Sequence, residues 1–128
     1  MKPGFEPAAF AAEWAAAWNA LDLDAVLVHF DEGVVFSTPK AVDTVGQPTV
    51  VGIPALRAYW AKALTRITSL RFTVVRAVWD GDRRELGIIY DRDVNGRHDR
   101  ALELLGFDRN GRVDRGEVFY GVIPERGA

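Results

Sequence analysis

Apolar and polar residues alternate through the last third of the chain, between short segments typical of tight turns. Asn95-Gly96 and Asn110-Gly111 are strong hairpin signals, because both residue types tolerate the positive φ of a type I′ turn. Asp80-Gly81-Asp82 predicts a further turn upstream. The turns define four strands of an antiparallel meander: Leu70–Trp79, Arg84–Val94, Arg97–Phe107 and Arg112–Val122. The register between the first two of these depends on how the upstream turn is made and stays open.

Three helices are predicted from apolar residues that recur at helical spacing. The first begins near Pro7, the second is capped by Asp22 and ended by Gly33, and the third begins near Pro54. Their apolar stripes are, in chain order, Phe10, Trp14, Trp18 and Leu21; Leu23, Val26, Leu27 and Phe30; and Ile53, Leu56, Trp60, Leu64 and Ile67. Each stripe occupies one face, so each helix is predicted to bury one side. These helices are the predicted cover for the apolar face of the meander.

A short strand is predicted between the second and third helices. Val34–Thr38 is rich in β-branched and aromatic residues and is stopped by Pro39. Lys40–Gly52 then forms a long connection, which is either a functional loop or a plain surface excursion. Helices followed by a run of strands indicate an α+β fold, and a length of 128 residues suits a single domain spanning residues 1–128.

Composition narrows the function classes. A net charge of −2 and an isoelectric point near 5.7 give no general attraction to nucleic acid or to an anionic membrane. The absence of cysteine excludes disulfides, thiol nucleophiles and cysteine zinc sites. No apolar run is long enough for a membrane span, and the first residues lack the apolar segment of a signal peptide. We therefore expect a cytoplasmic protein that binds neither nucleic acid nor membrane.

Glu103 is the residue that fits its strand least. It interrupts Ala101–Leu105, in which both strand faces are otherwise apolar, so the carboxyl is the odd group whichever face is buried. A buried, unpaired carboxylate is costly unless its pKa rises. One interpretation places Glu103 in an apolar pocket as a neutral hydrogen-bond donor. The other pairs it with Arg76 or Arg115, on the sheet or at an interface.

Hairpin geometry identifies the neighbours of Glu103. With Asn95-Gly96 as a two-residue turn, six residues share one strand face: Ile88, Tyr90, Arg92, Asp99, Ala101 and Glu103. Tyr90 can then offer its hydroxyl beside Glu103. Arg92 and Asp99, near the turn, are predicted to form an exposed ion pair of little energetic value.

The two histidines are not predicted to form a site. His29 lies off the apolar stripe of its helix and is predicted to be exposed. His98 flanks the hairpin turn, where it is predicted to pair with Asp93 or with solvent. Their separation does not fit a metal-ligand spacing, so neither a metal nor another cofactor is predicted.

Several segments are similar to those of a known superfamily. They are Trp18–Asp24 at the first helical junction, Gly52–Trp60 at the start of the third helix, and Asp80-Gly81-Asp82 and Phe107–Val113 at turns. With the order of elements, they resemble the nuclear transport factor 2-like superfamily, in its ketosteroid isomerase and SnoaL-like polyketide cyclase branches, over residues 6–122. The resemblance implies a cone in which three N-terminal helices and a strongly curved, mostly antiparallel sheet enclose a pocket. It also implies a homodimer.

The resemblance carries over only part of the isomerase site. The general-base aspartate, just before a proline after the first strand, corresponds to Thr38, which cannot take a proton from carbon as a carboxylate can. The oxyanion tyrosine of the first helix corresponds to Trp14, whose indole N–H donates but does not titrate. The aspartic acid of the penultimate strand corresponds to Glu103, and in ketosteroid isomerase an apolar site keeps that carboxyl neutral. Isomerisation by that mechanism is therefore not expected. The comparison also points Tyr120 toward the pocket, although a half-buried strand aromatic is an equal interpretation.

These observations lead to three hypotheses. The first is a SnoaL-like isomerase, cyclase or dehydratase that acts on a small hydrophobic, cyclic or polyketide-like molecule, with Glu103 as the acid or hydrogen-bond donor. Thr38, Tyr90 or Tyr120 would orient the ligand. The second is a non-catalytic ligand-binding module, and the third is an interaction domain that uses the outer sheet face. The predicted cavity walls are Trp14, Trp18, Phe36, Trp60, Tyr90, Leu105 and Tyr120.

Overall fold

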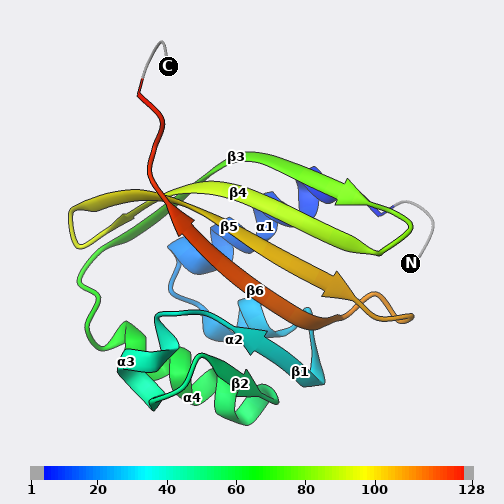
Figure 1. Cartoon of the computed structure of the whole chain (residues 1–128), viewed down its shortest axis with the longest axis horizontal. Coiled ribbons are helices and arrows are strands. Elements are labelled where there is room, and N and C mark those ends of the chain that lie inside the picture. The colour runs from blue at the N-terminus through cyan, green and yellow to red at the C-terminus, as the bar shows by residue number, and fades with distance from the viewer. Residues whose placement is uncertain (1–4, 126–128) are drawn as a thin grey trace.

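The strands predicted from the turn signals form four adjacent strands of a six-stranded sheet in the computed structural model, which describes residues 5–125 (Figure 1). The strand order is β2-β1-β6-β5-β4-β3, and all neighbours are antiparallel except β1 and β6, which are parallel. The strands are β1 (Phe30–Ser37), β2 (Thr49–Val51), β3 (Leu70–Asp80), β4 (Glu85–Val94), β5 (Arg97–Phe107) and β6 (Val113–Gly121). The α+β class and the mostly antiparallel sheet are therefore confirmed, and the sheet is open, with β2 and β3 at its edges.

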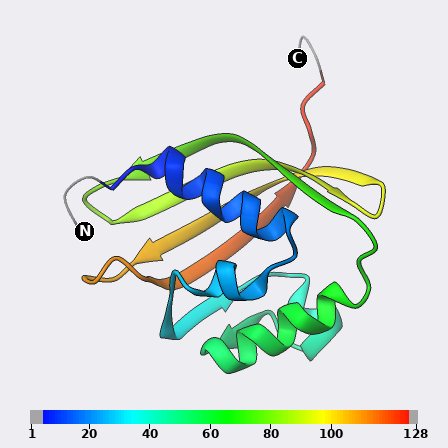
Figure 2. The same cartoon turned by 180° about the vertical axis from the view of Figure 1, so that it is seen from behind.

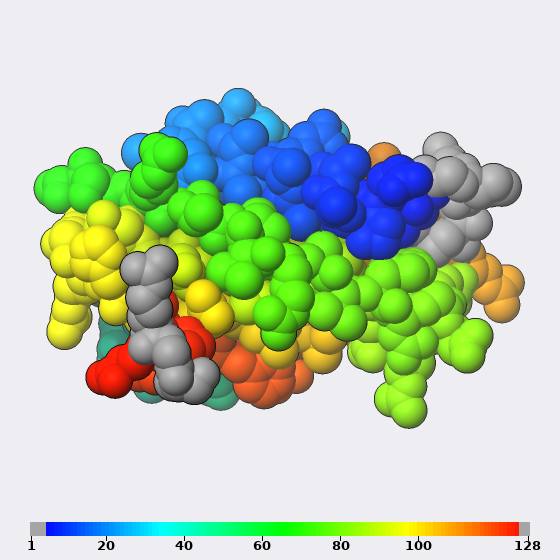
Figure 3. Space-filling view, turned by 90° about the horizontal axis from the view of Figure 1, so that it is seen from above, coloured from blue at the N-terminus to red at the C-terminus, as the bar shows by residue number. Residues whose placement is uncertain are grey.

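Four helices occur in the described part of the chain: α1 (Pro7–Asn19), α2 (Leu23–Leu27), α3 (Ala41–Val45) and α4 (Ile53–Leu64). The helices α1, α2 and α4 lie on the same side of the sheet (Figure 2). Figure 3 shows α1, in blue, lying directly against β3, in green, and α4 packs on β1 and β2. None of the helices within residues 5–125 is both long and apolar enough to cross a membrane.

Aromatic rings join the two long helices to the sheet. Trp18 of α1 and Trp60 of α4 pack edge to face, with 4.9 Å between ring centroids. Trp60 also meets the ring of Phe36 in β1 at 5.2 Å. Phe36 in turn lies so close to Gly116 of β6 that an added Cβ would stand 2.6 Å from its ring. These aromatic contacts therefore hold the two helices against the sheet.

The junction of the first two helices departs from the predicted stripe at one position. The helix α1 ends at Asn19, and Leu21 has a φ of 55° and an exposed fraction of 44%, so its placement on a buried helical stripe is wrong. The cap of α2 is confirmed, because Asp22 Oδ1 accepts a hydrogen bond from the backbone N of Ala25 at 3.1 Å. The chain therefore turns at Leu21 before α2 begins.

The second helix is shorter, and the first strand longer, than the sequence predicts. The helix α2 ends at Leu27 and Phe30 opens β1, so the prediction that Gly33 ends the helix is wrong. Phe30 pairs with Val113 in β6, and the backbone N of Val113 donates to the carbonyl of His29 at 2.8 Å. The chain therefore leaves the helical conformation after Leu27 and pairs with β6 from Phe30 onward. Phe30 is buried in this strand, as its apolar side chain predicts.

The connection after Pro39 contains two elements that the sequence did not predict, α3 and β2. The strand β2 pairs antiparallel with the end of β1. Gly46, with a φ of 84°, ends α3 in the left-handed region that favours glycine. Elements of five and three residues are too short to show a period. The connection therefore folds back on β1 instead of running freely over the surface.

The turn at Asn95-Gly96 is the predicted type I′ turn. The φ angles of the two residues are 55° and 82°. The β4–β5 register follows from it as predicted, with Cα partners that include Ile88 and Glu103, Tyr90 and Ala101, and Arg92 and Asp99.

The turn at Asn110-Gly111 is of a different kind. Only Gly111 has a positive φ, 79°, so the predicted type I′ turn is wrong here. The side chain of Asp108 organises the loop instead, because its Oδ1 accepts hydrogen bonds from the backbone N of Asn110 at 2.8 Å and of Arg112 at 2.9 Å.

The register that the sequence left open is continuous apart from one irregularity. The strands β3 and β4 pair along their length with a single shift between Val74 and Arg76, and such a shift bends a strand. The turn between them is made by Asp80, whose Oδ1 accepts hydrogen bonds from the backbone N of Asp82 and of Arg83 at 3.1 Å.

Asn19 attaches the end of α1 to the edge strand β3. Its Nδ2 donates to the carbonyl of Phe72 at 3.0 Å, and its Oδ1 accepts from the backbone N of Phe72 at 2.7 Å. We expect Asn19→Ala to lower the free energy of unfolding by about 1–3 kcal/mol, because both partners are left part-buried and unpaired. Urea denaturation measures this, with Asn110→Ala, at an exposed loop position, as the control. Equal losses in the two variants would contradict an attachment through the amide.

Candidate functional site

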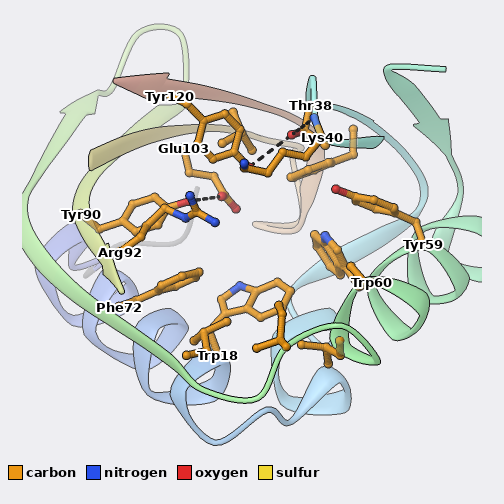
Figure 4. Close-up of a pocket in the computed structure, with 16 residues that line it drawn as sticks. Trp18, Thr38, Lys40, Tyr59, Trp60, Phe72, Tyr90, Arg92, Glu103 and Tyr120 are labelled. Carbon is orange, nitrogen blue, oxygen red and sulfur yellow. Dashed lines mark hydrogen bonds between the residues drawn. The ribbon is translucent and has the colours of Figure 1, made fainter. Parts of the chain in front are cut away.

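A cavity of about 110 Å³ lies between the sheet and the helices α1 and α4 (Figure 4). Seven of its 16 lining residues are aromatic: Trp18, Phe36, Tyr59, Trp60, Phe72, Tyr90 and Tyr120. A cavity of ~150 Å³ holds benzene, so this smaller, partly open space has room for no more than about one small ring.

Glu103 of β5 reaches into this cavity and is only 4% exposed. Its Oε1 accepts a hydrogen bond from the hydroxyl of Tyr90 in β4 at 3.2 Å. Burial raises the pKa of Glu103 from 4.5 to about 7, and contacts with Tyr90, Trp14 and Arg92 act in the lowering direction. The carboxyl therefore exists in both protonation states near neutral pH.

The second oxygen of this carboxyl has no regular partner. The indole Nε1 of Trp14 faces the carboxyl and acts to lower its pKa. Neither that nitrogen nor Glu103 Oε2, however, makes a hydrogen bond of ordinary geometry with any described residue. The Nε1 of Trp18, a residue of the cavity wall, is in the same situation. Buried polar atoms without partners are uncommon. Of the residues that carry them, Trp18 and Glu103 line the cavity, whereas Trp14 does not.

Among residues 5–125, no arginine forms an ion pair with Glu103. Arg115 donates to Asp114 at 2.9 Å and to the carbonyl of Arg83 at 3.2 Å. Arg76 is exposed. The carboxyl is instead held inside, beside Tyr90.

A group of hydroxyls also lies at the cavity. Thr38, which is 3% exposed, has its Oγ1 3.4 Å from the hydroxyl oxygen of Tyr120. Burial, and then the charge of Tyr120, raise the pKa of Tyr59 to about 12, against the contact with Thr38. Burial likewise raises the pKa of Tyr120, and it raises the pKa of Tyr90 well above 10.0. These hydroxyls therefore keep their protons at neutral pH and act as hydrogen-bond donors, not as bases.

Arg92 is a cavity residue that the sequence did not identify. Its predicted ion pair is present, with Nη1 2.9 Å from both carboxylate oxygens of Asp99. Its predicted exposure is wrong, because the side chain is only 12% exposed and Cζ lies 4.9 Å from the ring centroid of Tyr120. The guanidinium points into the cavity beside Glu103 (Figure 4). Lys40 reaches the other side of the site, with Nζ 4.5 Å from the Tyr120 centroid.

The burial of Arg92 follows from how the hairpin turn is attached. Asn95 Oδ1 accepts hydrogen bonds from the backbone N of Thr68 at 2.7 Å and of Ser69 at 3.2 Å. Asn95 Nδ2 donates to the carbonyl of Arg66 at 2.9 Å. The connection from α4 to β3 is thereby fixed to the turn, green against yellow in Figure 3, and covers this end of the hairpin.

Most of the predicted site residues line the cavity: Trp18, Phe36, Thr38, Trp60, Tyr90, Glu103 and Tyr120. Two predicted wall residues do not. Trp14 is buried behind the wall, stacked on Phe72 with 5.6 Å between ring centroids. Leu105 shares the strand face of Glu103 but is fully buried in the core. Tyr59 was missed because it is the neighbour of a stripe residue, not part of the stripe.

The histidines lie away from the cavity walls. His29 is half-buried, not exposed as predicted, because its ring packs on Phe10 at 5.0 Å. His98 pairs with Asp93 at 3.7 Å, as predicted. Within residues 5–125, no group of three histidine, aspartate or glutamate side chains is arranged to hold a metal ion.

The open curved sheet, with helices on its concave side, defines a nuclear transport factor 2-like protein. The profile of the SnoaL-like domain matches residues 11–113, and the chain belongs to that family. A SnoaL-like protein of unknown function from Burkholderia thailandensis is 30% identical, with a TM-score of 0.81 over 94% of this chain and 98% of that one.

Two more distant structures share the fold. One is a nuclear transport factor 2-like protein of unknown function from Burkholderia pseudomallei, which is 21% identical with a TM-score of 0.76, over 91% of this chain and 92% of that one. The other is TerC, co-crystallised with polyporic acid, which is 17% identical with a TM-score of 0.74 over the same shares of the two chains. No curated protein matches the chain.

Proposed function

We propose that the chain binds a small cyclic, largely apolar molecule in the cavity, and that Glu103 is the acid or hydrogen-bond donor to an oxygen of that molecule. The observation that carries this proposal is the carboxyl of Glu103, which is buried at a cavity rich in aromatic rings and has one hydrogen bond of regular geometry, from Tyr90. A carbonyl or hydroxyl oxygen of a ligand is the partner that this site lacks.

Proton donation by Glu103 is supported by its pKa of about 7. A group that titrates near the working pH is present in its acidic form and still releases its proton readily. Isomerases, cyclases and dehydratases all use a donor to a carbonyl or leaving hydroxyl oxygen. Thr38, Tyr90 and Tyr120 would orient the ligand through their hydroxyls.

The class of ligand is inferred from the cavity and the family. About one ring fits in the cavity, so a larger molecule would place one ring inside and extend outward from it. TerC, which shares the fold, was co-crystallised with polyporic acid. A putative polyketide cyclase from Sinorhizobium meliloti also shares the fold, at 16% identity and a TM-score of 0.69, and with the SnoaL-like assignment it supports a polyketide-like ligand.

A non-catalytic ligand-binding module is the second candidate, and one observation favours it. Thr38 stands where the isomerase branch has its general base, and the tyrosine hydroxyls at the cavity keep their protons at neutral pH. None of these hydroxyl residues can therefore act as the general base that would remove a proton from a carbon of the ligand. Binding without turnover is the expected result for such a module.

A thermal-shift screen tests the proposal. Cyclic ketones, phenols and aromatic acids are added to the wild type and to Glu103→Gln at one pH below 7 and one above it. We expect a neutral ketone or phenol to stabilise the wild type more at the lower pH, where Glu103 is protonated and donates. We expect this pH dependence to disappear in Glu103→Gln, with the difference in affinity up to about tenfold for one hydrogen bond.

Glu117→Gln is the matched control, because Glu117 is an exposed glutamate of β6 that does not line the cavity. It should leave both binding and its pH dependence unchanged. Ligand binding that is equally pH-dependent in Glu103→Gln would exclude Glu103 as the donor. Turnover of a ligand by the wild type and not by Glu103→Gln separates the enzyme from the binding module.

A further inference from the structure

A larger depression adjoins the cavity at the end of the β4–β5 hairpin. This outer depression has a volume of about 510 Å³ and shares Lys40, Ile67 and Arg92 with the cavity wall. Those three residues therefore lie on the border between the two spaces, which we call the mouth. A ligand with its ring in the cavity has room at the mouth for a substituent.

The outer depression is positively charged, although the protein as a whole has a net charge of −2. Lys40, Arg92 and Arg97 line it, against Asp99 as the single lining carboxylate. His98, also in its wall, is paired with Asp93. A concave site with an excess of positive side chains attracts anions.

Lys40 and Arg92 are held in place around one ring. The Tyr120 centroid lies 4.5 Å from Lys40 Nζ and 4.9 Å from Arg92 Cζ. Both hydrogen bonds from Arg92 to Asp99 use Nη1, and a guanidinium has further N–H donors on Nη2 and Nε. Lys40 makes no ion pair with another described residue.

We propose that the ligand carries an anionic group, such as a carboxylate, that binds at the mouth between Lys40 and Arg92 while its ring lies inside the cavity. The inference rests on the proposed function and adds the charge and orientation of the ligand to it. Charge-assisted hydrogen bonds to a partly buried arginine are among the stronger polar contacts. Glu103, deeper in the cavity, repels an anion whenever it is ionised, so the anionic group is directed outward and the neutral ring inward.

Matched pairs of ligands test the charge directly. Benzoate, phenylacetate and phenylbutyrate are each compared with the primary amide of the same shape, and the Kd is measured from tryptophan fluorescence, because Trp18 and Trp60 line the cavity. We expect at least one acid to bind about tenfold more tightly than its amide at low salt, and added salt to reduce that preference. The length of the best acid reports how far the ring lies from the mouth.

Lys40→Met should reduce this preference several-fold, because it weakens the binding of the acids more than that of the amides. Lys62→Met is the matched control: it changes the net charge equally, but Lys62 Nζ donates to the carbonyl of Thr44 and does not line either space. Lys40→Arg should restore the preference. These three results together support an anion site at the mouth.

The other outcomes are distinguishable. If acids and amides bind equally, and binding still depends on Glu103, the anion site is wrong and the proposed function stands. A preference for acids that Lys40→Met and Lys62→Met reduce equally comes from net charge alone, and it overturns the site. Failure of every acid and amide to bind overturns this inference together with the small-ring cavity on which it rests.

Discussion

Replacement of Trp14 by alanine is expected to lower the free energy of unfolding by about 3–5 kcal/mol. Trp14 is 1% exposed, and its indole stacks on Phe72 at 5.6 Å and meets Tyr90 edge to face at 4.8 Å between centroids. Its removal leaves a void directly behind the cavity wall, next to Glu103. Urea denaturation followed by far-ultraviolet circular dichroism measures the loss without depending on tryptophan fluorescence.

Trp14→Phe separates the volume of the indole from its N–H. Phenylalanine keeps an aromatic ring against Phe72 and Tyr90, so the loss of stability should be clearly smaller than for alanine. It also removes the N–H that acts to lower the pKa of Glu103, so that pKa should move further upward. If Trp14→Phe destabilises the fold as strongly as Trp14→Ala, the N–H contact, and not packing, is the main contribution of this residue.

The hairpin around Glu103 was predictable because its information is local. A two-residue turn at Asn95-Gly96 fixes every pair along β4 and β5, and alternation then places Tyr90 beside Glu103. The same alternation marked Glu103 as a carboxyl with no polar face to occupy. Glu103 and its hydrogen-bond donor Tyr90 could therefore be predicted from one turn and from the alternation of side chains along a strand.

The first half of the chain was harder to predict because distant strands decide its elements. Phe30 satisfies a helical stripe and a strand equally well, and only pairing with Val113, far along the chain, selects the strand. The helix α3 and the strand β2 are too short to carry a periodic signal, so the segment that begins with Lys40 was predicted as a long connection, either a functional loop or a surface excursion. The positive residue at the mouth was missed for this reason.

The strand face that a residue occupies and the depth at which it is buried are separate properties, and only the face could be predicted from the sequence. Leu105 and Glu103 share a face of β5, yet Leu105 is in the core and Glu103 is at the cavity. Arg92 also shares that face, and its burial depends on hydrogen bonds between Asn95 and residues 66–69, which no strand pattern contains. How far along a strand the helices and connections cover it is a tertiary property.

Glu103→Gln is expected to change how stability depends on pH by about 3 kcal/mol, the free energy that corresponds to a pKa moved from 4.5 to about 7. Below the unfolded-state value of 4.5, both states hold the proton, and the group does not lower stability. Between 4.5 and about 7, the unfolded chain releases the proton and the folded chain retains it, so the free energy of unfolding falls as the pH rises. Above about 7 that loss is complete, because the buried carboxyl is then ionised as well.

Glutamine does not titrate, so it is free of this loss, and its carbonyl oxygen still accepts a hydrogen bond from Tyr90. The wild type should therefore lose about 3 kcal/mol more than Glu103→Gln when urea denaturation is repeated from below pH 4.5 to above about pH 8. Glu117→Gln, at an exposed position, should follow the wild-type curve. Parallel curves for the wild type and Glu103→Gln would mean that Glu103 titrates as it does in the unfolded chain. In that case water must reach the carboxyl, and the aromatic cavity does not hold it in the neutral form that proton donation to a ligand requires.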